Sequence, residues 1–125
     1  MRYVGKLDKN IYRCVTDDIA TDVVIITDTQ IKHIIDRHPG DYERFFQFLP
    51  EIISNPDYIL EANKPNTALL LKEVHRADES FKLVLRIAVS TDDPSYKNSV
   101  ITFMKIDKKS LERLARNKKV LYKPE

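Results

Sequence analysis

The sequence of 125 residues has little cysteine and glycine and contains no tryptophan. Cys14 is the only cysteine, which excludes a disulfide within the chain and a zinc site built on several thiolates. The two glycines are too few for a phosphate-binding glycine-rich loop. No apolar run approaches the roughly 20 residues that cross a bilayer, and the N-terminus lacks the apolar stretch of a signal peptide. We therefore expect a protein made in the cytoplasm that makes no membrane contact; delivery into another cell stays open.

Charge is present in quantity but is unevenly distributed. The net charge is only +2, yet the stretch from Lys105 to Glu125 has eight basic and three acidic residues. This C-terminal stretch therefore carries +5 and the remainder of the chain carries −3. A basic segment of this kind is typical of a surface that follows a nucleic-acid backbone. The alternative interpretation is a solvent-exposed helix rich in lysine.

The first half of the chain predicts short strands followed by two helices. Tyr3–Leu7 and Ile11–Val15 have the pattern of a small hairpin, and Asp22–Ile26 is a β-branched run that indicates a strand. Thr27 and Gln30 have the spacing of a capping box. The helix that they begin is expected to stop near His38, because Pro39-Gly40 follows.

A second helix is predicted from Asp41, which we expect to cap it, to Asn55-Pro56. Its apolar side would consist of Tyr42, Phe45, Phe46, Leu49, Ile52 and Ile53. Pro50 lies inside this pattern, so the sequence predicts either a kink or two short helices.

The second half changes to the period of β-strands. The predicted strands are Asp57–Ala62, Thr67–Val74, Phe81–Ser90 and Ser99–Ile106, with links short enough for antiparallel neighbours. Asp107 is expected to cap a last helix, and Val120–Tyr122 to add an edge strand. Helices segregated from an antiparallel sheet define an α+β fold. We predict one domain over residues 1–125, with an N-terminal β unit at 1–26 and a core at about 24–122.

The segment Ile31–Gly40, IKHIIDRHPG, holds two of the three histidines. At about 100° per residue, His38 falls on the apolar stripe beside Ile34, whereas His33 and Arg37 fall together on the other side. His38 is therefore expected to point toward the sheet, either as a proton-transfer group or as a core histidine bonded to a carbonyl. His33 and Arg37 are either part of the site or an ordinary polar helix face. The spacing does not put both imidazoles on one face, so no metal site is predicted.

Arg86 is unusual because it interrupts an apolar strand, in LVL-R-IAV. A buried cation must either pair with a negative group of the protein or bind a negatively charged ligand. It is expected either to form a salt bridge, with Glu73 or another carboxylate, or to grip a phosphate bidentately. Ser90 should share its face, and Thr102 would lie close by if it has the matching orientation. Lys72 is either a functional lysine or an edge lysine that discourages aggregation.

With these features together, the sequence resembles the phage-associated branch of the barnase–EndoU–colicin–RelE superfamily of small metal-independent ribonucleases. The resemblance spans about residues 24–122. It rests on IITDTQIKHIIDRHPGDY, PEIISNPDYIL, TALLLKEV, FKLVLRIAV and NSVITFMKI. It implies two N-terminal helices on a four-stranded antiparallel sheet, RNA cleavage that is often directed at tRNA, and a role in mobile elements or toxin systems. It implies no cofactor.

These observations lead us to expect an endoribonuclease that uses the RNA 2′-OH and leaves a 2′,3′-cyclic phosphate, with RNA and a cognate immunity protein or inhibitor as partners. His38 would be the preferred acid–base group and His33 its alternative or partner. The residues assigned to cleavage are His38, His33, Arg86 and Thr102, and those assigned to further substrate contacts are Ser90, Lys72 and Lys105. Two alternatives are a non-catalytic nucleic-acid-binding module and a protein-interaction domain.

Overall fold

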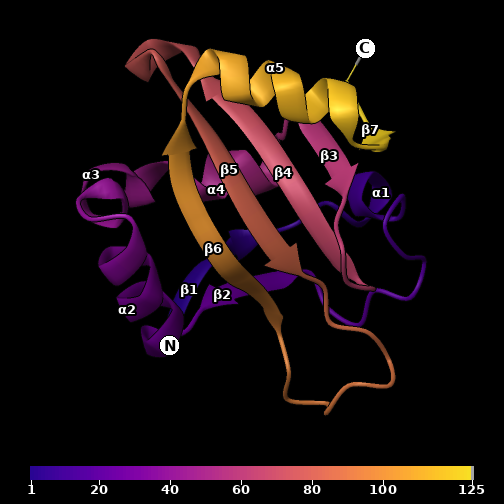
Figure 1. Ribbon diagram of the computed structural model, residues 1–125. Coiled ribbons are helices and arrows are strands. Elements are labelled where there is room, and N and C mark those ends of the chain that lie inside the picture. Colours follow the sequence, from indigo (N-terminus) through magenta and orange to yellow (C-terminus); the bar gives the residue numbers. More distant parts are fainter. Residues whose placement is uncertain (125) are drawn as a thin grey trace.

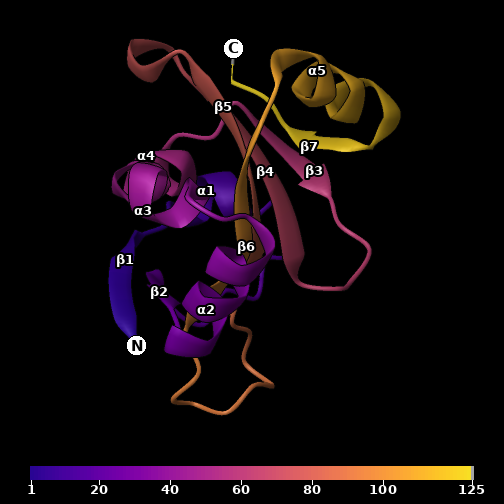
Figure 2. The same ribbon diagram turned by 60° about the vertical axis from the view of Figure 1, so that its left-hand side comes forward.

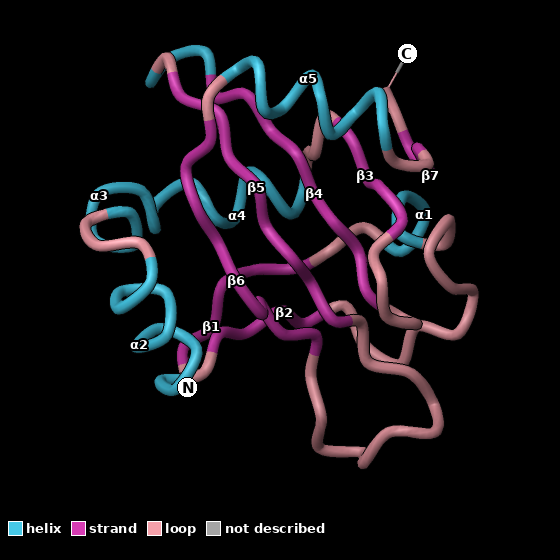
Figure 3. Tube along the Cα trace, viewed as in Figure 1, coloured by secondary structure: helices cyan, strands magenta, loops and turns pink. Residues whose placement is uncertain are grey.

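The computed structural model describes residues 1–124, so that Glu125, the end of the predicted domain, lies outside the described residues. One sheet has helices on both of its faces (Figures 1 and 3). Its strands are β1 (Arg2–Lys6), β2 (Val23–Ile26), β3 (Tyr58–Glu61), β4 (Thr67–Val74), β5 (Glu79–Arg86), β6 (Asn98–Ile106) and β7 (Val120–Tyr122). The α-helices are α1 (Lys9–Tyr12), α2 (Asp28–Arg37), α3 (Asp41–Phe45), α4 (Leu49–Ser54) and α5 (Lys108–Asn117).

The α+β class is confirmed, but the sheet is larger than predicted. Its seven strands run in the order β1-β2-β6-β5-β4-β3-β7. The four predicted strands form its centre as antiparallel neighbours, in the order β6-β5-β4-β3. The difference arises because β2 pairs with β6 in parallel, which brings β1 with it, and because β7 adds to β3. The expected edge strand at Val120–Tyr122 is thereby confirmed.

The predicted N-terminal hairpin is wrong. Ile11–Val15 forms no strand, and β1 pairs instead with β2. The Asp8 carboxylate accepts a hydrogen bond from the backbone N–H of Asn10 and so caps the short helix α1. The Tyr12 side chain at the end of this helix is fully buried, and its hydroxyl donates to the carbonyl of Ile53. Tertiary burial of one aromatic side chain therefore overrides the local strand pattern.

The boundary between α2 and α3 is only partly as expected. The Thr27 hydroxyl accepts from the N–H of Gln30, and α2 ends with His38 as its C-cap, as the sequence predicts. Asp41 is not the cap of the next helix; that position belongs to Gly40, whose φ of 87° suits a residue without a side chain. The Asp41 carboxylate instead accepts from the backbone N–H of Lys105 on β6.

The expected break at Pro50 is confirmed. Residues 41–54 form α3, a 3-10 turn at Phe46–Phe48, and then α4, with Pro50 in the first turn of α4. Proline is tolerated there because a first-turn N–H has no partner within the helix.

The predicted strand Phe81–Ser90 is too long, since β5 ends at Arg86. Beyond it, side chains replace the strand partners of the backbone. The N–H of Ala88 donates to the side chain of Asn98, and that of Val89 donates to the carboxylate of Asp92. Residues 87–97 therefore form an ordered loop that hangs below the sheet in Figure 1.

Two apolar clusters cover the two faces of the sheet. The larger one joins the inner faces of α2, α3 and α4 to the sheet, and in it the ring of Phe81 contacts those of Phe45, Phe48 and Phe103. The smaller one is centred on Leu111 of α5, which packs on the opposite face (Figure 2). Within residues 1–124, no helix is long and apolar enough to cross a membrane.

Candidate functional site

A pocket lies on the face of the sheet that carries α5. This helix crosses only one end of β4, β5 and β6, and the rest of their surface is left without a helix on this side (Figure 1). The pocket has a volume of about 490 Å³ and lies between α5 and the loop that joins β3 to β4. Its lining residues are Ala62, Asn63, Lys64, Thr67, Leu69, Lys82, Val84, Arg86, Ile101, Leu114 and Lys118.

Strand alternation brings the floor of the pocket together. On β5 the side chains of Lys82, Val84 and Arg86 share one face, as the alternating pattern predicts. Leu69 of β4 lies directly opposite Val84 in the register. On the other side, β6 has a register shift next to Val84, and its Ile101 lies at this shift and also faces the pocket. The floor is therefore aliphatic, with polar groups at its margins.

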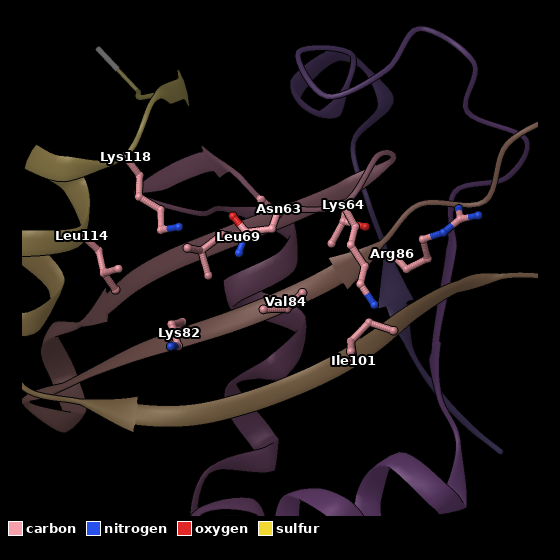
Figure 4. Close-up of a pocket in the computed structure, with 11 residues that line it drawn as sticks. Asn63, Lys64, Leu69, Lys82, Val84, Arg86, Ile101, Leu114 and Lys118 are labelled. Carbon is pink, nitrogen blue, oxygen red and sulfur yellow. The ribbon is translucent and has the colours of Figure 1, made fainter.

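Three lysines reach the pocket from three different elements. Lys82 projects from β5, Lys64 comes from the β3–β4 loop and Lys118 follows the end of α5. Figure 4 shows Lys64 and Lys118 extending over the sheet from separate sides. No acidic residue is among the described residues that line this pocket. Like charges gathered without a counter-charge raise the local positive potential, and an anion relieves their repulsion.

Arg86 contributes its aliphatic stem to the pocket, while its guanidinium lies beyond the end of β5 (Figure 4). The guanidinium donates to both carboxylate oxygens of Asp92, at 3.2 and 2.9 Å, and to the carbonyl of Ile87. The Tyr96 ring centre is 5.4 Å from its central carbon. The salt bridge expected for Arg86 is therefore present, and its partner is Asp92 rather than Glu73.

Asp92 holds the loop 87–97 to the end of β5. Its carboxylate accepts from the N–H of Val89 at 2.8 Å, and it also receives the Arg86 pair. The Val89 N–H first and the Arg86 guanidinium second hold the pKa of Asp92 below its ordinary value of 3.8. The carboxylate therefore stays charged at neutral pH and keeps Arg86 fixed.

The two hydroxyl candidates are placed differently. Thr102 is half-buried and lies opposite Val84 in the register of β5 and β6, so it shares the face of the pocket with Arg86. Ser90 lies outside β5, and its hydroxyl and N–H both donate to the Asp18 carboxylate. Thr102 is thus brought near the pocket, and Ser90 is held in the loop region.

The two lysine candidates lie elsewhere. Lys72 pairs in register with Phe81 and so faces the larger core, where its ammonium lies 3.4 Å from the Asp57 carboxylate. It lies on a central strand rather than at a sheet edge. Lys105 lines a separate pocket beside Glu79, with 3.6 Å between their charged atoms. The structure brings neither lysine to Arg86.

Neither α2 histidine is among the residues that line the pocket. His38 is half-buried as the C-cap of α2, while His33 is exposed. Ile34 is buried in the larger core, but Ile35 is 36% exposed, so the apolar stripe is narrower than the angular count indicates. Helix α2 packs against β6, the strand that carries Thr102 (Figure 1).

The lysine cluster of the pocket is absent from the residues selected from the sequence. Alternation in β5 does place Lys82 beside Arg86, and this signal could have identified it. Lys64 and Lys118 lie in a loop and at a helix end, where local patterns carry no such signal. Within residues 1–124, no group of three or more histidine, cysteine, aspartate or glutamate side chains is arranged to hold a metal ion.

Comparison with protein families gives a match over nearly the whole chain. The family described as phage-Barnase-EndoU-ColicinE5/D-RelE like nuclease2 matches residues 1–123. The chain belongs to this family. The resemblance inferred from the sequence is thereby confirmed, and it extends over the N-terminal segment as well. Membership supports a nuclease activity, and the α+β architecture fits the barnase–EndoU–colicin–RelE fold. No curated protein and no solved structure matches the chain.

Proposed function

We propose that this member of the nuclease family is an endoribonuclease that needs no metal ion. The ribose 2′-OH attacks the adjacent phosphorus, the bond to the 5′-oxygen breaks, and the products are a 2′,3′-cyclic phosphate and a 5′-hydroxyl end. The observation that carries this proposal is the pocket on the α5 face, which four basic and no acidic side chains line among the described residues. Such a pocket is suited to the phosphates of RNA.

The cations have a defined task in this reaction. Attack by the 2′-OH produces a phosphorane with additional negative charge, and fixed cations stabilise that charge most where water is partly excluded. Lys82 is half-buried in the pocket and is the first candidate for this role. Arg86 would join it by exchanging Asp92 for the scissile phosphate, which has similar bidentate geometry. Thr102 would donate a hydrogen bond to the same phosphate.

Proton transfer is assigned to the histidines of α2. His38 is proposed as the preferred acid–base group and His33 as its alternative or partner, because imidazole changes charge near neutral pH. Helix α2 packs on the face of the sheet opposite to α5, so both would have to reach the substrate around the part of β6 that follows its pairing with β2 at Asn98 and Ser99. Ser90, Lys72 and Lys105 take no part in this proposal, because none of them lines the pocket and each is held by a carboxylate.

The experiment is RNA cleavage by the purified protein with EDTA present. Substrates are tRNA, an unstructured RNA and the same RNA with a single 2′-deoxyribose at the mapped cut site. We expect cleavage without metal, a cyclic phosphate on the 5′ fragment and no cut at the deoxy position. His38→Ala and Arg86→Ala should both lose activity while their folds persist by circular dichroism. Cleavage that requires metal, or that proceeds at the deoxy position, contradicts the mechanism.

The second candidate is a non-catalytic RNA-binding module of the same fold. Two observations favour it. Among the described residues, no histidine lines the pocket. In addition, the Arg86 guanidinium is already hydrogen-bonded to the Asp92 carboxylate. Salt-dependent RNA binding without cleavage of any substrate in the same assay would support this candidate over the enzyme.

A further inference from the structure

We propose that the pocket takes one unpaired nucleotide, with its base on the aliphatic floor and against Leu114 of α5, and with its flanking phosphates on the lysines. This inference rests on the proposed function, because it names the part of the RNA that the same site holds. It gives α5 a direct role as one wall of the binding site, in addition to its packing on the sheet.

The floor of the pocket has the chemistry of a base-binding surface. Leu69 and Val84 lie opposite each other on neighbouring strands, and Leu114 faces them from the helix. Phosphate alone would gain nothing from such an aliphatic floor, whereas a nucleobase buries one of its faces on it. The Asn63 amide, at the margin, has two donors and an acceptor with which to contact a base edge.

The size of the pocket restricts the state of that base. Its volume of about 490 Å³ lies within the usual range of small-molecule sites and is sufficient for one nucleotide. A base within a duplex is stacked and paired, so it must leave the helix before it can enter a recessed pocket. The substrate is therefore a single strand or a loop.

The positions of the lysines match the two phosphates that flank a nucleotide. Lys64 approaches from the β3–β4 loop and Lys118 from the end of α5, so that cations stand on separate sides of the floor (Figure 4). A nucleoside within a chain has one phosphate on its 5′ side and another on its 3′ side. Lys82 lies on the floor on the side of Lys118 in Figure 4, so it is placed to contact the phosphate that Lys118 holds.

Calorimetry with the full chain tests this inference without relying on cleavage. The probes are the four nucleoside 3′,5′-bisphosphates and inorganic phosphate. We expect at least one bisphosphate to bind about tenfold or more tighter than phosphate, because contacts to a base add to those of its phosphates. Ala62→Leu, which adds bulk at the pocket margin, should remove this advantage and leave phosphate binding unchanged. Ala115→Leu is the matched control, since Ala115 lines a different pocket on α5.

A second measurement covers the case in which Ala62→Leu fails to fold. Methyl NMR signals of Val84 and Leu114 in the unaltered protein should shift on addition of a bisphosphate and remain unchanged with phosphate. Bisphosphate binding no tighter than phosphate, or equal effects of Ala62→Leu and Ala115→Leu, overturns the inference even if the protein cuts RNA. Base-dependent binding without cleavage of any RNA supports the inference and overturns the proposed nuclease mechanism.

Discussion

At the scale of single residues, Arg86 shows how an intramolecular contact can limit a binding group. Its two contacts to Asp92 have the bidentate geometry in which arginine also binds phosphate. A substrate phosphate that uses this guanidinium therefore competes with a carboxylate already in place. Lys82 meets no such competition in the pocket, because no acidic side chain is among the described residues that line it.

The Asp92 contacts predict how the loop 87–97 responds to acid. The pKa of Asp92 is lower in the folded state than its ordinary value of 3.8, so its stabilising effect is complete above that value. The effect is lost as the pH falls through the lowered pKa. An NMR titration should show the Val89 amide signal steady from pH 7 to about 4 and changing only below that. If the Val89 amide signal instead changes above pH 5, and does so equally in Asp92→Asn, a group other than Asp92 holds the loop.

At the scale of elements, the caps of α2 and α5 show local chemistry deciding where a helix begins. The Thr27 hydroxyl accepts from the N–H of Gln30 at 3.1 Å. Replacing Thr27 by alanine should lower the free energy of unfolding by about 1 kcal/mol, because that N–H loses its partner. Thr29→Ala, at an exposed position in the same first turn, is the control and should change stability much less. Urea unfolding of the two variants provides the measurement, and equal losses would contradict the capping role.

Caps and alternation are therefore the features that could be predicted from the sequence. Thr27 and Asp107 both cap helices where their spacing indicates. In each case the determining atoms lie within three residues of one another along the chain. The placement of Lys82 and Arg86 on one face of β5 follows equally from neighbouring positions.

The features that could not be predicted depend on distant partners. Ile11–Val15 has the composition of a strand, but Tyr12 is buried against α4, more than forty residues further along the chain. The end of β5 depends on Asn98, whose side chain takes the N–H that a strand partner would have taken. The lysine pocket depends on how far α5 extends across the sheet, which no local pattern specifies.

At the scale of the whole molecule, the N-terminal segment is tied to the main core rather than appended to it. Leu7 and Tyr12 belong to the same apolar cluster as Phe81 and Phe103. The Tyr12 hydroxyl donates to the Ile53 carbonyl at 2.6 Å in a fully buried setting, and this burial raises the pKa of Tyr12 well above its usual range.

This arrangement predicts that the described chain unfolds as one unit. Tyr12→Phe should lower the free energy of unfolding by about 1–2 kcal/mol, since it leaves a buried carbonyl without its donor. Tyr3→Phe, at a position 59% exposed, is the matched control and should have little effect. Thermal unfolding followed by tyrosine absorbance and by circular dichroism should give coincident single transitions for the unaltered protein and both variants. An early, separate transition in Tyr12→Phe would show that the N-terminal segment folds independently.

We propose the pocket on the α5 face as the site where RNA is bound and cut. The most direct test compares Lys82→Met, which keeps the length of the side chain and removes its charge, with Lys9→Met, a matched change at an exposed position on α1. Both variants are assayed for cleavage of the same single-stranded RNA in EDTA, after thermal unfolding has shown that they are folded. We predict a loss of about 100-fold or more in kcat/KM for Lys82→Met and none for Lys9→Met. Equal activity in the two variants would place the nuclease site elsewhere on the molecule.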